Sequence, residues 1–226
     1  MPFKDILGTI VPTYISLSKI EAKILDTIIT EKSGNAYGLW KRSGLKHYPT
    51  VLRTLKKLEE KRLIKVLRES GVRGERIYAP TVVGTLVFHI FNREEKKIVK
   101  IVAKNSGLFR ELYKIDKDDD LAFFAVQDII LDVYRRKKPR GIGEAVEERV
   151  GEEIFGRILN IDERETEWIL KFSKVKWVRE RAIREIESER TRLRQRMNDL
   201  EELAKKLKQL WWLEQYELYS KEEEKA

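Results

Sequence analysis

Apolar residues in the first part of the chain recur at helical spacing, interrupted by turn signals. Ser18-Lys19-Ile20-Glu21 has the form of a capping box, and a helical apolar pattern follows it. Ser33-Gly34-Asn35 ends that helix, and a short second helix is expected over 36–42. A third helix is expected from Tyr48-Pro49 to about residue 62, because proline is tolerated in the first helical turn.

A hairpin and a fourth helix follow. Residues 63–67 and 76–79 read as strands, and the segment 69–75 between them contains two glycines typical of a turn. Pro80 ends the second strand, and Thr81 can cap a helix over 82–91. Three helices, a hairpin and a helix are the order of a winged helix-turn-helix domain, which we expect over residues 1–92.

The rest of the chain has only helical patterns, so the predicted fold class is mainly α. Short helices are expected over 94–104 and 108–115, followed by longer ones over 121–136 and 142–159. These form a helical linker or bundle over 93–161. Asp162 and Glu165 suggest a second capping box, and no glycine or proline follows. We therefore expect one long helix over 162–226.

That last segment carries a heptad pattern typical of a coiled coil. With Ile183 at position a, aliphatic residues occupy four successive d positions, although Arg190 and Ala204 interrupt the a positions. The pattern predicts a homodimer, while a helical hairpin within one chain is the alternative. The expected dimerisation residues are Ile183, Ile186, Leu193, Met197, Leu200, Leu207 and Trp211.

Positive charge is concentrated in the winged-helix segment. Residues 31–80 hold 13 Lys or Arg and five Glu, a net charge of +8 out of +9 for the whole chain. A localised basic segment is typical of a protein that binds a polyanion such as DNA. The chain as a whole is 38% charged, against roughly 25% in typical soluble domains, as in many thermophile proteins.

The third helix is the expected DNA-reading element. Its apolar stripe, Val51, Leu52, Leu55 and Leu58, is expected to face the core. We expect the opposite face to contact the major groove, with Arg53 and the two threonines near bases and the lysines near phosphates. That face holds Thr50, Arg53, Thr54, Lys57 and Lys61.

Further DNA contacts are expected on either side of this helix. Lys46, His47 and Tyr48 immediately precede it, and Arg68, Arg73 and Arg76 lie in or beside the wing. A wing arginine can enter the minor groove or bind phosphate. The basic segment 135–141 is either a second DNA contact or a solvated loop.

Residues 17–84 resemble the PadR-like winged-helix transcriptional regulators. The matching motifs are Tyr37-Gly38, the run from Thr50-Val51-Leu52 through Leu55-Lys56-Lys57-Leu58-Glu59-Glu60 to Leu63-Ile64, the return strand Arg76-Ile77-Tyr78, and Thr81-Val82-Val83-Gly84. The family usually has Tyr in place of Leu52 and Gly in place of Arg62. The resemblance implies a dimeric transcription factor whose C-terminal helices pair, sometimes with a ligand pocket at the interface.

Several chemistries are excluded by what the sequence lacks. It has no cysteine and only two histidines, His47 and His89, so disulfides and Cys- or His-rich metal sites are not expected. It shows no phosphate-binding loop and no catalytic constellation, so we expect neither an enzyme nor a cofactor. A small-molecule effector cannot be identified from the sequence.

The expected function is that of a dimeric transcriptional regulator that reads double-stranded DNA with the helix 48–62 and a basic wing. A nucleoid or replication-associated architectural protein with low sequence specificity is the alternative. A protein-interaction adaptor is a third possibility, although an adaptor has no need of +8 in 50 residues. The sequence has neither a signal-peptide pattern nor a long apolar segment, which predicts a cytoplasmic, nucleoid-associated protein without a membrane partner.

Overall fold

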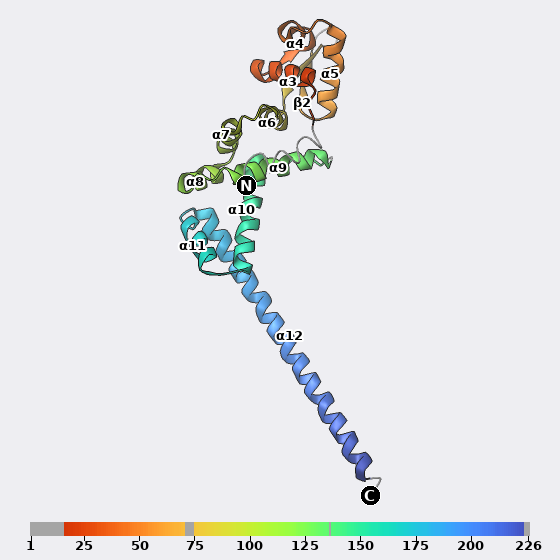
Figure 1. Ribbon diagram of the computed structural model, residues 1–226, viewed down its shortest axis with the longest axis vertical. Coiled ribbons are helices and arrows are strands. Elements are labelled where there is room, and N and C mark those ends of the chain that lie inside the picture. Colours follow the sequence, from red (N-terminus) through yellow and green to blue (C-terminus); the bar gives the residue numbers. More distant parts are fainter. Residues whose placement is uncertain (1–15, 71–74, 136, 224–226) are drawn as a thin grey trace. The chain divides into compact units, whose positions relative to one another are not determined.

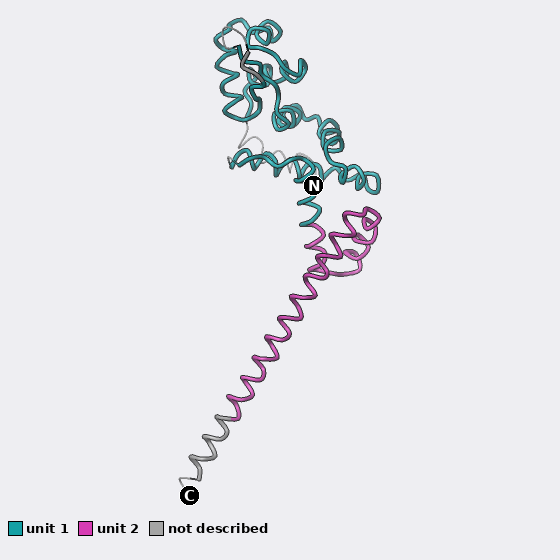
Figure 2. The backbone as a smooth tube through the Cα atoms, turned by 180° about the vertical axis from the view of Figure 1, so that it is seen from behind, with its two compact units in different colours: residues 1–152 teal, residues 153–226 magenta. Residues whose placement is uncertain are grey.

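The computed structural model describes residues 16–70, 75–135 and 137–223, and it divides into two compact units, residues 1–152 and 153–226 (Figure 2). The first unit begins with a winged helix (Figure 1). Its elements are α3 (Lys19–Glu31), β1 (Gly34–Asn35), α4 (Ala36–Ser43), α5 (Tyr48–Glu60), β2 (Ile64–Ser70), β3 (Glu75–Pro80) and α6 (Val82–Phe91). The three antiparallel strands lie in the order β1-β3-β2. The predicted fold class is therefore confirmed.

Local caps define where these helices begin. The Ser18 hydroxyl accepts from the Glu21 amide at 3.2 Å, and the Glu21 carboxylate accepts from the Ser18 amide at 2.7 Å. Together these bonds form the predicted capping box of α3. The Asn35 side chain caps α4 by accepting from the Gly38 amide at 2.7 Å. Thr81 caps α6, as the sequence predicts, by accepting from the Gly84 amide at 2.9 Å.

Thr81 and Gly84 also join α6 to the start of the hairpin. The Thr81 amide donates to the Leu63 carbonyl oxygen at 3.0 Å, and its hydroxyl reaches the same oxygen at 3.0 Å. The backbone of α6 passes so close to Leu63 that a Cβ on Gly84 would lie 2.8 Å from the Leu63 carbonyl carbon. Only glycine fits without a shift, because real Cβ atoms essentially never approach within 3.0 Å.

The core of the winged helix is made by one stripe from each helix. The fully buried side chains are Ile24, Leu25 and Ile28 from α3, Leu39 from α4, Val51, Leu55 and Leu58 from α5, and Leu86 and Val87 from α6. Burial of this kind supplies roughly 1.5–3 kcal/mol per side chain before conformational entropy is subtracted. The stripe on α5 therefore fixes which of its faces points to solvent.

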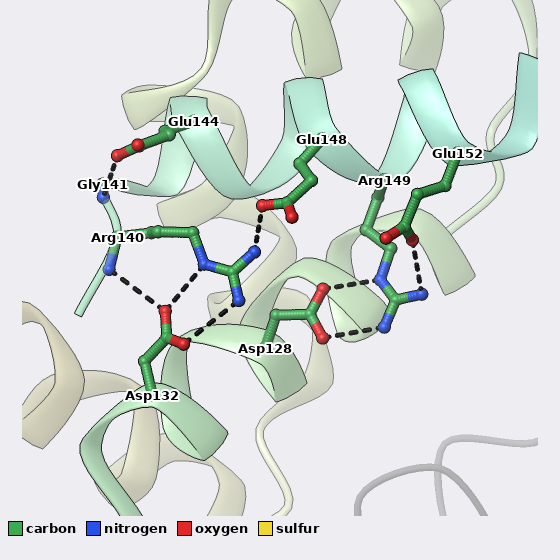
Figure 3. Close-up of polar contacts among 8 residues, drawn as sticks. All are labelled: Asp128, Asp132, Arg140, Gly141, Glu144, Glu148, Arg149 and Glu152. Carbon is green, nitrogen blue, oxygen red and sulfur yellow. Dashed lines mark hydrogen bonds and ion pairs between the residues drawn. The ribbon is translucent and has the colours of Figure 1, made fainter. Parts of the chain in front are cut away.

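Four helices complete the first unit: α7 (Glu95–Asn105), α8 (Gly107–Ile115), α9 (Asp120–Tyr134) and α10 (Ile142–Leu159), the last of which continues into the second unit. Two forked ion pairs tie the last turns of α9 to α10 and its leading loop (Figure 3). The Arg149 guanidinium donates two hydrogen bonds to the Asp128 carboxylate, at 2.6 and 2.7 Å. The Arg140 guanidinium donates two to the Asp132 carboxylate, at 2.7 and 3.1 Å. The Arg140 guanidinium holds the pKa of the buried Asp132 carboxyl below its usual value, although burial opposes this.

The second unit contains the end of α10, α11 (Glu163–Phe172) and α12 (Lys176–Glu223). The prediction of one unbroken helix from residue 162 is wrong, because the chain turns at 173–175. Phe172, Val175 and Val178, in and beside this turn, are all buried, and tertiary packing therefore interrupts a sequence that has no helix breaker. Asp162 caps α11 by accepting from the Glu165 amide at 2.9 Å, while the Glu165 carboxylate pairs with Arg157.

Candidate nucleic-acid interface

The exposed face of α5 is basic and also exposes one leucine. Solvent-exposed side chains at Leu52, Arg53, Lys56 and Lys57 follow one another at the three- and four-residue spacing of a single helical face. They lie on the first two and a half turns of the helix. A helix of this kind fits the major groove, and its N-terminal half is the part that approaches base edges.

This face is rotated by about one residue from the predicted one. Thr54 was expected to face DNA but is buried, and its hydroxyl donates to the Thr50 carbonyl at 2.8 Å. Leu52 was expected in the core but keeps 43% of its surface exposed. The physical reason is that a threonine whose hydroxyl is satisfied by its own helix can occupy a core position. Lys56 belongs to the exposed face and was missed.

Lys61 was expected to meet phosphate but makes its contacts within the protein. Its Nζ lies 2.8 Å from the Glu21 carboxylate and donates to the Ser16 carbonyl oxygen at 2.8 Å. Burial opposes ionisation of Glu21, but the hydrogen bonds from Lys61 and Ser18 outweigh it and hold the pKa of Glu21 below its usual value. Lys61 therefore ties the end of α5 to the start of α3.

An aromatic cluster joins α4 to the start of α5. The rings of Tyr37, Trp40 and Tyr48 lie 5.6 to 6.3 Å apart in tilted or edge-on contacts, and Lys41 lies 4.8 Å above the Tyr37 ring. Of the predicted contacts, His47 is exposed at the N-cap of α5, Tyr48 is half-buried and Thr50 is half-buried. Lys46 is exposed in the preceding turn. The aromatic residues of α4 were missed because their helical spacing is equally typical of a core stripe.

The wing contributes one predicted arginine whose side chain can be placed. Arg76 on β3 is exposed and lies 3.8 Å from Glu59 on α5. Arg68 has its backbone in β2, opposite Ile77 across a bulge, while its side chain and all of Arg73 lie outside the described residues. Lys65 on β2 is also exposed and was not singled out from the sequence.

The basic segment 135–141 divides into two parts. Arg135, Lys137 and Lys138 are exposed. Arg140 is half-buried between Asp132 and Glu148, which Figure 3 shows on neighbouring helices. Arg140 is thus part of the ion-pair network. Arg136 lies outside the described residues, and among the described residues of this segment three exposed cations remain to meet a polyanion.

Within residues 16–70, 75–135 and 137–223, no three His, Asp or Glu side chains come together as metal ligands. None of the described helices combines the length and apolar character of a membrane span.

Comparisons with known proteins add little to this picture. No family model matches the chain, and curated proteins yield no match. Among solved structures the chain is similar to a MarR family regulator from Neisseria meningitidis, with 22% identity over 54% of this chain and 92% of that one, and a TM-score of 0.31. Values this low carry no functional argument, and the resemblance to PadR-like regulators stays a prediction.

Proposed function

We propose that this chain is a DNA-binding regulator that contacts double-stranded DNA through α5 and the wing and acts as a homodimer. The observation that carries the proposal is the exposed face of α5, where Arg53, Lys56 and Lys57 are exposed together with Leu52 on a winged helix. The lysines suit phosphate contacts, and Arg53 suits a forked contact to guanine. The exposed Leu52 beside them suits the methyl group of thymine.

Removing the two lysines tests the DNA contact. Each phosphate contact adds close to one unit to the slope of log affinity against log salt, so the double change Lys56→Ala/Lys57→Ala should flatten the slope by up to about two units. It should weaken binding to all duplexes alike, because phosphate contacts carry no sequence information.

The matched control removes the same charge elsewhere in the first unit. Lys96 and Lys100 are exposed on α7, one helical turn apart, as neighbours on one face. Lys96→Ala/Lys100→Ala should leave the salt slope unchanged. If the two double variants behave alike, α5 is not the DNA contact and the proposal fails.

Arg53 separates sequence reading from general attraction. If it makes a forked contact to guanine, Arg53→Ala should cost about 1–3 kcal/mol on a preferred site and less on random DNA. Binding isotherms on selected and random duplexes measure both values. An equal loss on both would favour the architectural alternative over a sequence-specific regulator.

The homodimer is proposed to form through α12. The apolar positions from Ile183 to Trp211 are 44% to 61% exposed in one chain, and burying them against a second chain would remove them from water. Leu193→Asp/Leu200→Asp would place charges in that seam, which are costly to bury without partners. Light scattering should then show a monomer. The winged helix of this variant should stay folded. A wild-type chain that is monomeric at tens of micromolar would contradict the homodimer.

A further inference from the structure

The exposed apolar stripe of α12 is long. From Ile183 to Trp211 it covers about 42 Å of helix at 1.5 Å per residue. The longest other described helix, α10, has 18 residues or about 27 Å, and most of its apolar residues from Ile142 to Ile158 are already buried, Phe155 being the exception. A second copy of α12 is the element that matches this stripe in both length and composition.

Charges beside the stripe show how two copies can pair. With Ile183 at position a, the e positions are Glu187, Arg194, Glu201 and Lys208, all exposed. Their signs alternate from negative to positive, so the row changes sign when it is reversed end to end. In antiparallel helix pairs the e positions of one chain face the e positions of the other. Two such rows are therefore complementary in antiparallel orientation.

We propose that two copies of this chain pair through α12 as an antiparallel coiled coil whose two-fold axis passes between Met197 and Leu200. In that register Glu187 faces Lys208 of the partner subunit, and Arg194 faces Glu201 of the partner subunit. The two-fold axis repeats both pairs. Shifting the register by one heptad in either direction brings like charges together, Glu201 against its own copy or Arg194 against its own copy, which disfavours those alternatives.

The apolar layers distinguish this arrangement from a parallel one. In the antiparallel register the small Ala204 meets Leu193 of the partner subunit, and Ile186 meets Trp211 of the partner subunit. Arg190 meets an aliphatic residue, Leu207 of the partner subunit. A parallel pair would instead set Arg190 against Arg190, Ala204 against Ala204 and Trp211 against Trp211. Those layers would combine a buried repulsion, a gap and an overlarge pair.

The arrangement separates the two copies of the second unit. Lys176, where α12 begins, lies about 22 residues from the axis, so the two starts of α12 are about 70 Å apart. The inference rests on the proposed homodimer but needs no DNA contact, and its tests are made without DNA.

Disulfide cross-linking tests the orientation, and the chain has no natural cysteine to interfere. Leu193→Cys and Ala204→Cys chains are mixed, allowed to exchange and oxidised mildly. We expect a cross-link between the two kinds of chain and none when Leu193→Cys is oxidised alone, because its copies are then about 16 Å apart along the rod. Cross-linking of Leu193→Cys with itself, or no cross-link in the mixture, overturns the proposal.

Charge reversal provides a second test with a matched control. Glu201→Arg should weaken the dimer at least tenfold in sedimentation equilibrium, because two arginines then meet. Adding Arg194→Glu should restore it, since the opposed pair is complementary again. Adding Arg196→Glu to Glu201→Arg should not restore the dimer, although it reverses the same charge two residues away. Arg196 is the informative control because it would be the partner of Glu201 in a parallel pair. Rescue by Arg196→Glu in place of Arg194→Glu overturns the antiparallel arrangement.

Discussion

Gly84 allows the closest backbone approach in the winged helix, and Gly84→Ala tests whether that approach is required. The added Cβ would lie far inside the van der Waals contact distance of the Leu63 carbonyl oxygen and 2.8 Å from its carbonyl carbon. Ordinary contact begins at 3.4 Å, so the carbonyl carbon alone requires α6 and Leu63 to separate by about 0.6 Å, and the nearer oxygen requires more. The obstacle is backbone, which cannot rotate away as a flexible side chain can.

The expected cost follows from what this shift disturbs. Overpacking in a core costs about 1–3 kcal/mol, and weakening the Thr81 cap, which binds both Gly84 and Leu63, adds about 1 kcal/mol. Alanine in place of glycine in a helix returns about 1 kcal/mol. The net prediction is a loss of about 1–3 kcal/mol in the free energy of unfolding.

Denaturant unfolding followed by circular dichroism measures this loss. Gly143 in α10 is the control, because a Cβ there would meet the Asn105 carbonyl at an ordinary 3.5 Å. Gly143→Ala should be neutral or stabilising by up to about 1 kcal/mol. If Gly84→Ala unfolds at the same denaturant concentration as the wild type, the close approach of α6 to Leu63 is not a constraint on the fold.

Two further predictions concern ion pairs. Lys61→Met should destabilise the chain by about 1–2 kcal/mol, because Glu21 loses a partner. The slope of log DNA affinity against log salt should stay unchanged. A flatter slope would show that Lys61 contacts DNA after all. Arg140→Met should cost about 2–3 kcal/mol at pH 7 by leaving buried Asp132 unpaired, whereas Arg135→Met, at an exposed site in the same loop, should be neutral. Because the pKa of Asp132 in the folded chain lies below its ordinary value of 3.8, the ion pair stabilises the fold fully above about pH 4 and less as the pH falls further. Urea unfolding at pH 7, 5 and 3 should therefore show that the loss of stability caused by Arg140→Met becomes smaller at low pH. A loss that stays constant with pH would contradict this assignment.

The sequence predicted the winged helix well because its helices are defined by local signals. The caps at Ser18 and Thr81 mark the starts of α3 and α6, and Pro49 lies in the first turn of α5. Arg62 is instructive, because it stands where PadR-like regulators usually have glycine. Its φ of 57° lies in the left-handed region, so the backbone between α5 and β2 keeps the conformation that glycine favours.

The candidate site was harder to predict because polarity does not determine burial. Thr54 is buried with its hydroxyl satisfied, and Leu52 is exposed, so the face of α5 could not be assigned from residue types alone. Lys61 was part of the predicted face, yet its ammonium group pairs with the carboxylate of Glu21, forty residues away in sequence. Such long-range pairs leave no local signal. The turn at 173–175 has the same origin, since packing rather than a helix breaker produces it.

The forked pairs between α9 and α10 also bear on how the chain responds to heat. Hydration of charged groups becomes less favourable as temperature rises, so the penalty for removing Asp128 and Asp132 from water falls. Arg140 and Arg149 each bridge a second carboxylate as well, Glu148 and Glu152, so charges are shared across a network (Figure 3). The contribution of this network to the stability of the α9–α10 pair should therefore grow on warming. This helix pair should be among the last parts of the first unit to unfold.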